Sequence, residues 1–198
     1  MSDKYMIIMR GLPGSGKSTI AKNIYDYQDQ FPTHQLPLLK PGTLLNPGNG
    51  YGFTRGPEIV SADDYMINTQ GEYVFDSTKL GLNHTLCFAR ALYLAHEEHH
   101  PLIIIDNTNM SRHEISPYLM LGQLSGYRIL ILHVEPPRLF GGVDTKFLAE
   151  KNVHGVPHTV ISDMSERMER LPTYWPEEKR IFPQDWKTSA NLIPKSSK

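Results

Sequence analysis

A glycine-rich octapeptide that directly follows a short apolar run constrains the fold of this chain more than any other feature. Residues 5–9 (YMIIM) are apolar and flanked by charge, a pattern typical of a buried strand. The octapeptide GLPGSGKS at residues 11–18 matches the pattern G-x-x-x-x-G-K-[ST] without a mismatch. Ile20 and Ile24 then recur at helical spacing. The sequence therefore predicts a strand, a tight loop and a helix in succession.

The chemistry of this loop indicates phosphate binding. Its glycines allow successive backbone N–H groups to turn inward around phosphate oxygens at a helix N-terminus. Lys17 can reach the β- and γ-phosphates of a nucleotide, and the Ser18 hydroxyl is a hard oxygen ligand for Mg²⁺. A glycine-rich turn without function is the alternative, which the full motif between strand and helix disfavours. The expected nucleotide-binding residues are Gly11, Leu12, Pro13, Gly14, Ser15, Gly16, Lys17, Ser18 and Thr19.

Three further apolar runs alternate with helical patterns along the rest of the chain. Strands that are apolar throughout are typical of parallel sheets covered on both faces, and alternation with helices indicates right-handed crossovers. The expected fold is therefore α/β, with three αβα layers around a parallel central sheet. The further strands are expected at residues 58–61, 101–106 and 127–134, and the helices near residues 77–98, 112–124, 143–150 and 157–170.

The start of the helix near residue 112 has two interpretations. Ser111 and Glu114 fit a capping box, in which each residue binds the backbone of the other. Alternatively, Ser116 caps a helix whose first residue is Pro117. The sequence alone leaves both open.

Length and composition indicate one soluble domain with an elaboration. The 198 residues carry a net charge of −1, which excludes a globally basic, duplex-coating protein and leaves room for a local basic groove. Cys87 is the single cysteine and cannot form an internal disulfide, which favours a reducing, intracellular location such as the cytoplasm. No apolar run approaches the roughly 18 residues of a membrane span, so no membrane association is expected.

Two segments depart from the α/β pattern. Residues 31–57 are rich in Pro and Gly and form an expected insertion, whose aromatic and basic side chains either stack on bases or pin the loop to the body. Those side chains are Tyr51, Phe53 and Arg55. From residue 171 the chain holds several prolines and little periodicity. The domain that contains the phosphate loop is therefore expected to span residues 1–170, followed by a C-terminal tail at 171–198 that wraps the surface or frays.

Acidic residues follow two of the expected strands. Asp63 and Asp64 come after the run 58–61, and Asp106 closes the run 101–106. In an open parallel sheet, ligands bind beyond the carboxyl ends of the strands, so these carboxylates are expected to face the phosphate loop. Asp106 would hold Mg²⁺ directly or through water, and Asp63 would accept a proton from an attacking hydroxyl. Alternatively, Asp63 and Asp64 merely cap the next helix, the interpretation favoured for Asp64.

With these motifs in this order, the sequence resembles the 5′-polynucleotide kinase-like P-loop family of AAA-type kinase domains. Its members include the phage polynucleotide kinase and the P-loop domain of cyclic-nucleotide phosphodiesterase. The stretches that carry the resemblance are RGLPGSGKST at residues 10–19, SADDY at 61–65, IIIDNTN at 103–109 and LAEKNVHGVP at 148–157. The resemblance implies a P-loop NTPase/kinase fold with ATP and Mg²⁺ as cofactors. It makes Asp63 the general base for an acceptor 5′-hydroxyl.

The resemblance also assigns roles to the remaining site residues. Segment 148–157 corresponds to a lid over ATP, in which Lys151 and His154 are the candidates for the cation that neutralises transferring charge. Two positions depart from the family pattern: Met66 stands where the phage enzyme has an acceptor-binding Arg, and His154 stands where it has a lid Arg. The residues expected to shape the acceptor pocket are Asp64, Tyr65, Thr108 and Asn109.

The function expected first is ATP-dependent transfer of the γ-phosphate to a 5′-hydroxyl of RNA or DNA. A small-molecule or nucleoside kinase on the same fold is one alternative, because a fold does not determine its acceptor. A nucleotide-gated binding module with slow ATP hydrolysis is the other. The expected partners are ATP and a nucleic-acid 5′ end, and the sequence leaves protein partners unknown.

Overall fold

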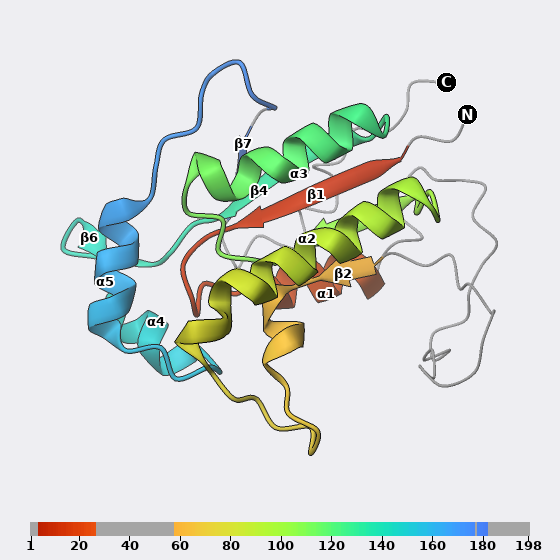
Figure 1. Cartoon of the computed structure of the whole chain (residues 1–198). Helices are drawn as coiled ribbons and strands as arrows, with labels where there is room; N and C mark the ends of the chain where they lie inside the picture. Colours follow the sequence, from red (N-terminus) through yellow and green to blue (C-terminus); the bar gives the residue numbers. More distant parts are fainter. Residues whose placement is uncertain (1–3, 27–57, 177, 182–198) are drawn as a thin grey trace.

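A five-stranded parallel sheet is the frame of residues 4–26, 58–176 and 178–181, the part of the chain that the computed structural model describes (Figure 1). The strands lie in the order β2-β3-β1-β4-β7, with Ile7 of the central strand in register with Ile104 on one side and Leu130 on the other. The strands are β1 (Tyr5–Arg10), β2 (Glu58–Val60), β3 (Leu102–Ile105), β4 (Arg128–Val134) and β7 (Glu178–Ile181). The four strands expected from the apolar runs and their parallel pairing are confirmed.

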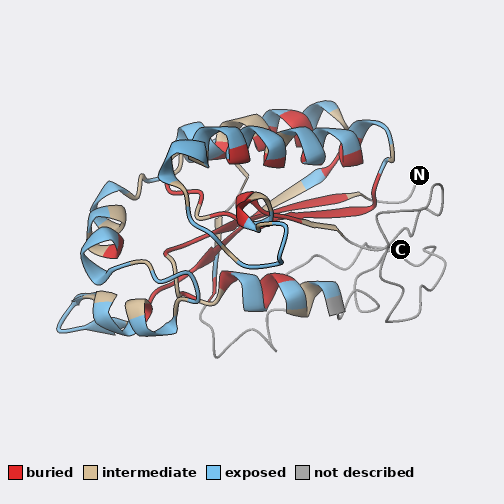
Figure 2. Cartoon of the chain, turned by 60° about the horizontal axis from the view of Figure 1, so that its bottom comes forward, coloured by how far each residue is buried: buried red, intermediate tan, exposed pale blue. Residues whose placement is uncertain are grey.

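The alternation of side chains along β1 divides the core into two layers. Met6 and Ile8 pack with residues of two helices on one face, whereas Ile7 and Met9 pack with residues of a third helix on the other. Figure 2 shows the buried strands between these helix layers. The first face is covered by α2 (Leu80–His96) and α3 (Arg112–Leu124), and the second by α1 (Lys17–Asp26). The expected αβα layering is confirmed.

A smaller unit lies beyond the carboxyl ends of the strands (Figure 1). Leu148 and Ile161 from its two helices pack with Leu12 of the phosphate loop and with Met110 in a third apolar cluster. The unit comprises the hairpin β5 (Arg138–Leu139) and β6 (Gly142–Val143), followed by α4 (Thr145–Lys151) and α5 (His158–Arg167). The segment expected to be a lid therefore joins α4 to α5 and rests against the loop that it would close.

Two short 3₁₀ turns connect β2 to α2. They are η2 (Ala62–Met66) and η3 (Ser77–Lys79). Between them the chain doubles back, because Ile67 and Tyr73 form an antiparallel bridge. This reversal brings Tyr73 back to the turn that carries Asp63.

The start of α3 follows the first of the two interpretations. Ser111 is the N-cap, and its hydroxyl accepts a hydrogen bond from the Glu114 N–H at 3.3 Å. The Glu114 carboxylate accepts from the backbone N–H of Met110 at 2.7 Å, one residue before the position that a full capping box uses. Pro117 lies inside the helix, so the alternative start at Ser116 is wrong.

The expectation of a tail from residue 171 misses one strand. Residues 178–181 form β7, which pairs in parallel with β4 through contacts such as Ile131 with Glu178. Three of the four β7 residues are charged, so no apolar run announces the strand, and only pairing at the sheet edge reveals it. Trp175 and Leu171 also pack against the core, in line with a segment that wraps the surface. The boundary of the domain at residue 170 stays a prediction.

The expected insertion at 31–57, including Tyr51, Phe53 and Arg55, lies outside the described residues. Among the helices that the structure does describe, none is both long enough and apolar enough to cross a bilayer.

Candidate active site

The phosphate loop lies at the carboxyl edge of the sheet and is held there by its neighbours. The Gly11 N–H donates a hydrogen bond to the Thr108 carbonyl oxygen at 3.0 Å, which ties the loop to the segment after β3. Gly14 has a φ of +76°, and a Cβ at this position would lie 2.1 Å from the Leu148 carbonyl oxygen. Because only glycine fits this space and conformation, the backbone of α4 rests directly on the loop.

Lys17 points inward at the base of the loop. It is 8% exposed, and its Nζ donates to the Leu12 carbonyl oxygen at 2.9 Å. Burial lowers the pKa of Lys17 to about 8, although the nearby Asp106 and Asp63 carboxylates act to raise it. A buried ammonium group is suited to bind a multiply charged anion such as a nucleotide phosphate, and the two carboxylates favour its charged form.

Asp106 follows β3 and lies close to Lys17, as the strand-end argument predicts. Burial raises the pKa of Asp106, whereas the Lys17 charge and a hydrogen bond with Ser18 lower it. The structure therefore brings together Ser18 and Asp106, the two residues that the sequence proposes as metal ligands.

Two buried oxygens of this site, Asp106 Oδ1 and Ser15 Oγ, have no hydrogen-bond partner among the described residues. Buried polar atoms are almost always paired in native proteins, so such atoms indicate a missing ligand. A divalent cation would satisfy the carboxylate oxygen, and a phosphate oxygen would accept from the serine hydroxyl. The residues present thus fit a nucleotide phosphate with Mg²⁺, which Ser18 and Asp106 would hold.

The two acidic residues of η2 differ in what they do. The Ser61 hydroxyl accepts from the Asp63 N–H, and the Asp64 carboxylate accepts from the Ser61 N–H at 3.2 Å, which completes a capping box. Asp64 therefore caps the turn, as its alternative interpretation predicts. The Asp63 side chain takes no part in the cap and is 45% exposed, which leaves it available for chemistry.

The Asp63 carboxylate contacts one side chain from each side of the site. Its Oδ1 accepts a hydrogen bond from the Tyr73 hydroxyl at 3.2 Å, and its Oδ2 lies 3.5 Å from His154 Nε2 of the lid. The rings of Tyr73 and His154 lie 4.2 Å apart between centroids. Sequence reasoning named Asp63 and His154 but missed Tyr73, because nothing local marks a tyrosine ten residues later as a partner.

Asn152 gives the lid turn its shape. Its Oδ1 accepts from the backbone N–H groups of His154 and Val156, and its Nδ2 donates to the carbonyl oxygens of Ala149 and Val156. These four hydrogen bonds close the turn and present His154 to Asp63. Lys151, the other lid candidate, is exposed, and its Nζ lies 5.6 Å from the centroid of the Phe147 ring.

Two residues expected to shape an acceptor pocket form hydrogen bonds with backbone carbonyl oxygens. The Asn109 amide is buried and donates to the Met9 carbonyl oxygen at 2.6 Å, which joins β1 to the segment after β3. The Tyr65 hydroxyl donates to the Leu86 carbonyl oxygen of α2 at 3.2 Å, and its ring packs against the core. Their polar groups are already paired with backbone, and the acceptor role of both residues stays a prediction. Thr108 contributes its carbonyl oxygen to the phosphate loop.

Asn107 is a positioning residue that the sequence did not single out. Its Oδ1 accepts from the Ala62 N–H at 2.9 Å, and its Nδ2 lies 3.4 Å from Cys87 Sγ. The side chain is buried and links the end of β3 to the first residue of η2. It therefore holds the turn that carries Asp63 at a set distance from Asp106.

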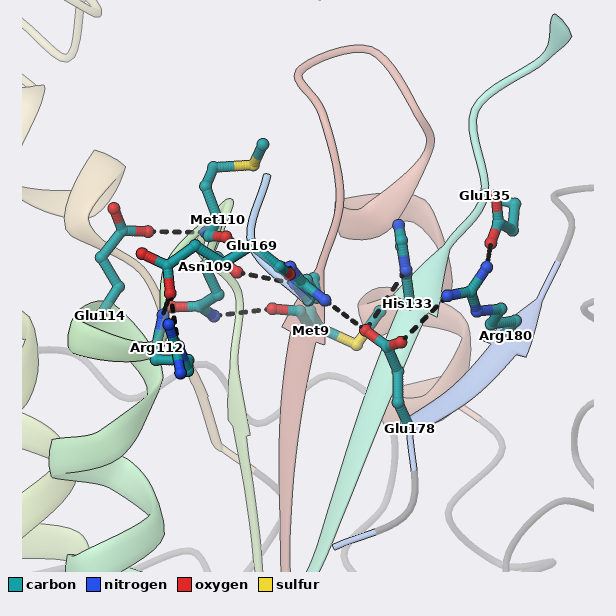
Figure 3. A network of polar contacts seen from close by, with 11 residues as sticks. Met9, Asn109, Met110, Arg112, Glu114, His133, Glu135, Glu169, Glu178 and Arg180 are labelled. Carbon is teal, nitrogen blue, oxygen red and sulfur yellow. Dashed lines mark hydrogen bonds and ion pairs between the residues drawn. The ribbon is translucent and has the colours of Figure 1, made fainter. Parts of the chain in front are cut away.

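Arg10, the residue before the phosphate loop, is buried at the centre of a polar network, and Figure 3 labels its partners Asn109, Met110, Glu169 and Glu178. Its guanidinium donates to the carbonyl oxygens of Asn109 and Met110 at 3.1 and 3.2 Å, and also to the Glu169 carbonyl oxygen. It forms an ion pair with Glu178 of β7. One side chain thus ties the base of the loop to the end of the lid unit and to the edge strand.

Glu178 is held as a carboxylate by this network. Burial by itself would raise the pKa of Glu178, but contacts with His133 and Arg10 outweigh it and lower the pKa to about 2. Arg180 bridges the same carboxylate and that of Glu135, as Figure 3 shows. Because Arg10 is a charged residue at the end of an apolar strand, the sequence indicates that it needs polar partners. The sequence does not indicate which residues these partners are.

The sheet, the phosphate loop and the acidic strand ends together define a class: the chain has a P-loop kinase-like fold. No family model matches it. The chain is 32% identical to NEDD4-binding protein 2 of Homo sapiens over 166 residues, and this match covers 84% of the present chain. It is 22% identical to YLP motif-containing protein 1 of Rattus norvegicus over 189 residues, and this match covers 87% of the present chain. The chain spans only 8% and 12% of these two proteins.

Several solved structures share the fold at low sequence identity. Kti12 of Chaetomium thermophilum in complex with ADP-AlF3 matches with a TM-score of 0.58 and 15% identity over 95% of this chain and 94% of that one. The APS kinase CysC of Mycobacterium tuberculosis, in complex with AMPPNP and APS, matches with a TM-score of 0.56 and 12% identity over 98% and 96%. A chain of the Pnkp1/Rnl/Hen1 RNA repair complex matches with a TM-score of 0.54 and 16% identity over 85% and 45%.

Proposed function

We propose that this chain is an ATP-dependent kinase that transfers the γ-phosphoryl group to the 5′-hydroxyl of a nucleic acid. The observation that carries the proposal is the convergence of Asp106 and Asp63 on Lys17, at the edge of the sheet where the phosphate loop lies. The SADDY and IIIDNTN stretches favour a polynucleotide acceptor. The fold shared with a chain of an RNA repair complex supports it further.

Each residue of the site has a distinct part in this reaction. Backbone N–H groups of the phosphate loop and the Lys17 ammonium bind the phosphates of ATP. Ser18 and Asp106 would hold Mg²⁺, and the ion would neutralise charge on the phosphate oxygens. Asp63 takes the proton of the acceptor hydroxyl while the hydroxyl oxygen forms a bond to the γ-phosphorus. The bond between the γ-phosphorus and the β-phosphate oxygen breaks, and ADP leaves.

A lid cation completes the proposed site. His154 lies beside Asp63, whereas Lys151 lies at the end of α4 over the Phe147 ring. Such cations stabilise the charge of the transferring group. His154 can act in this way only while it is protonated, whereas a lysine ammonium carries its charge at neutral pH.

Two other functions use the same nucleotide site. A small-molecule kinase is one, since the APS kinase shares the fold. A nucleotide-gated binding module is the other, since a lid resting on the phosphate loop is suited to a switch. Both retain the roles of the loop and differ from our proposal in the acceptor.

The test is a transfer assay with γ-labelled ATP across RNA and DNA oligonucleotides, nucleosides and sugars. Oligonucleotides that already carry a 5′-phosphate are the matched control, because they lack only the acceptor hydroxyl. We expect label on 5′-hydroxyl oligonucleotides alone. Label on a nucleoside or sugar instead would establish the small-molecule kinase, and ATP binding without any transfer would favour the switch.

Two variants then separate the acidic strand ends. Asp63→Asn should keep ATP–Mg²⁺ affinity and lose about 10²–10⁴-fold in rate, because the amide cannot take a proton. Asp106→Asn should raise the Mg²⁺ concentration needed for turnover and regain rate as metal is added. Asp76→Asn, which removes an exposed carboxylate that caps η3, is the control and should behave as wild type. Rescue of Asp63→Asn by metal, with Asp106→Asn unaffected by it, would show that the two roles are exchanged.

A further inference from the structure

Tyr73 lies outside every sequence motif described above, yet its hydroxyl forms a hydrogen bond with Asp63, the candidate general base. It donates to Asp63 Oδ1 at 3.2 Å and lies at the same distance from Met66 Sδ. The backbone bridge between Ile67 and Tyr73 brings the ring back over η2. The contact is therefore built by the chain reversal.

The protonation state of Tyr73 suits it to a permanent donor. Burial and the neighbouring Asp63 carboxylate raise the pKa of Tyr73 to about 12. The phenol therefore keeps its proton at neutral pH and remains a hydrogen-bond donor. A half-exposed aspartate without a partner samples several rotamers, whereas a donor at Oδ1 holds the carboxylate in one orientation.

The second oxygen of the same carboxylate faces the lid. His154 Nε2 lies 3.5 Å from Asp63 Oδ2, and the His154 ring packs on the Tyr73 ring. Asn152 fixes the turn that presents this histidine. Tyr73 thus touches both the carboxylate and the lid, and Oδ2 is the carboxylate oxygen that faces the lid rather than the Tyr73 hydroxyl.

We propose that Tyr73 is a positioning residue for phosphoryl transfer: it holds Asp63 through Oδ1, so that Oδ2 takes the proton of the acceptor hydroxyl. The proposal rests on the function proposed above, in which Asp63 is the general base. In the transfer step the acceptor O–H proton moves to Oδ2, as the acceptor oxygen bonds to the γ-phosphorus and ADP departs with the bonding electrons. The acceptor hydroxyl then takes the place that His154 Nε2 has at Oδ2.

The test is Tyr73→Phe, which removes the hydroxyl and keeps the ring against His154. We measure the single-turnover rate constant for transfer to a 5′-hydroxyl oligonucleotide at saturating ATP and acceptor, together with the affinity for each. The rate constant should fall about 10-fold, because an Asp63 carboxylate without this hydrogen bond is in the reacting orientation for less of the time. Both affinities should stay at the wild-type value, since the substitution changes neither the phosphate loop nor the Asp63 carboxylate.

Tyr127→Phe is the matched control. Tyr127 directly precedes β4, and its hydroxyl donates to the His100 carbonyl oxygen. This contact lies at the amino ends of the strands, whereas the candidate site lies at their carboxyl ends. This variant should lose stability and keep the wild-type rate constant. Calorimetric ATP binding by Tyr73→Phe verifies that its site is folded.

Three results would overturn the inference. A wild-type rate constant in Tyr73→Phe shows that the hydroxyl does not position the base. Weaker ATP and acceptor binding without a lower rate constant shows a merely structural role. If the wild-type chain phosphorylates no 5′-hydroxyl at all, the proposed function fails and the inference fails with it, which distinguishes the two cases.

Discussion

Replacing Lys17 with methionine removes a buried charge from the phosphate loop and keeps most of the apolar stem. The Lys17 ammonium is buried, and in the folded protein its pKa falls from 10.5 to about 8 even though the carboxylates of Asp106 and Asp63 attract it. In the protein without nucleotide, this charge therefore opposes folding. The buried Lys17 charge is explained by its role in binding phosphate rather than by a contribution to stability.

The size of this effect follows from the two pKa values. The difference between the pKa values of 10.5 and about 8 corresponds to a cost of about 3 kcal/mol for holding the charged lysine in the folded wild type. Lys17→Met removes this cost but also loses the hydrogen bond to Leu12, which offsets about 1 kcal/mol of the gain. Below pH 8 the lysine is charged in both states, and the folded protein carries the full cost. Between pH 8 and 10.5 the unfolded chain binds one proton more, so the stability of the wild type rises with pH. Lys17→Met should thus be more stable by about 1–3 kcal/mol at pH 7, and this gap should close above pH 8.

Urea unfolding without nucleotide or metal, from pH 7 to 9.5, measures this gap. Calorimetry in parallel should show that Lys17→Met has lost ATP binding. Lys22→Met, at an exposed position of α1, is the matched control and should change stability by less than about 0.5 kcal/mol at every pH. A Lys17→Met protein that is less stable than wild type at pH 7, or a gap that does not vary with pH, would refute the reasoning.

Two further predictions concern the contacts that hold the loop. Gly14→Ala should cost about 2–4 kcal/mol in urea unfolding and weaken ATP binding, because a Cβ at positive φ meets the Leu148 carbonyl oxygen and pushes α4 away; wild-type stability would contradict this close packing. Glu178→Gln should cost about 2 kcal/mol at pH 7, and the cost should vanish as the pH falls from 4.5 towards 2, where the wild-type carboxylate protonates; a cost independent of pH would contradict the ion pair with Arg10.

The parts of this protein that sequence determined by itself are those with a local signal. Apolar runs predicted four of the strands because a strand buried on both faces needs no partner to be recognised. The phosphate loop was predicted because its glycines, lysine and serine are consecutive, and their spacing alone states the chemistry. Asp106 could be placed near Lys17 from the rule that the ends of parallel strands share one edge.

Tertiary structure decided every feature that depends on direction or on distant partners. Asp63 and Asp64 are adjacent and chemically identical, and only the η2 turn makes one a cap and leaves the other facing Tyr73 and His154. The strand β7 exists because the edge of β4 pairs with it, which its own charged residues do not announce. Side-chain partners far apart along the chain are selected by the packing of whole elements, so no local pattern records them.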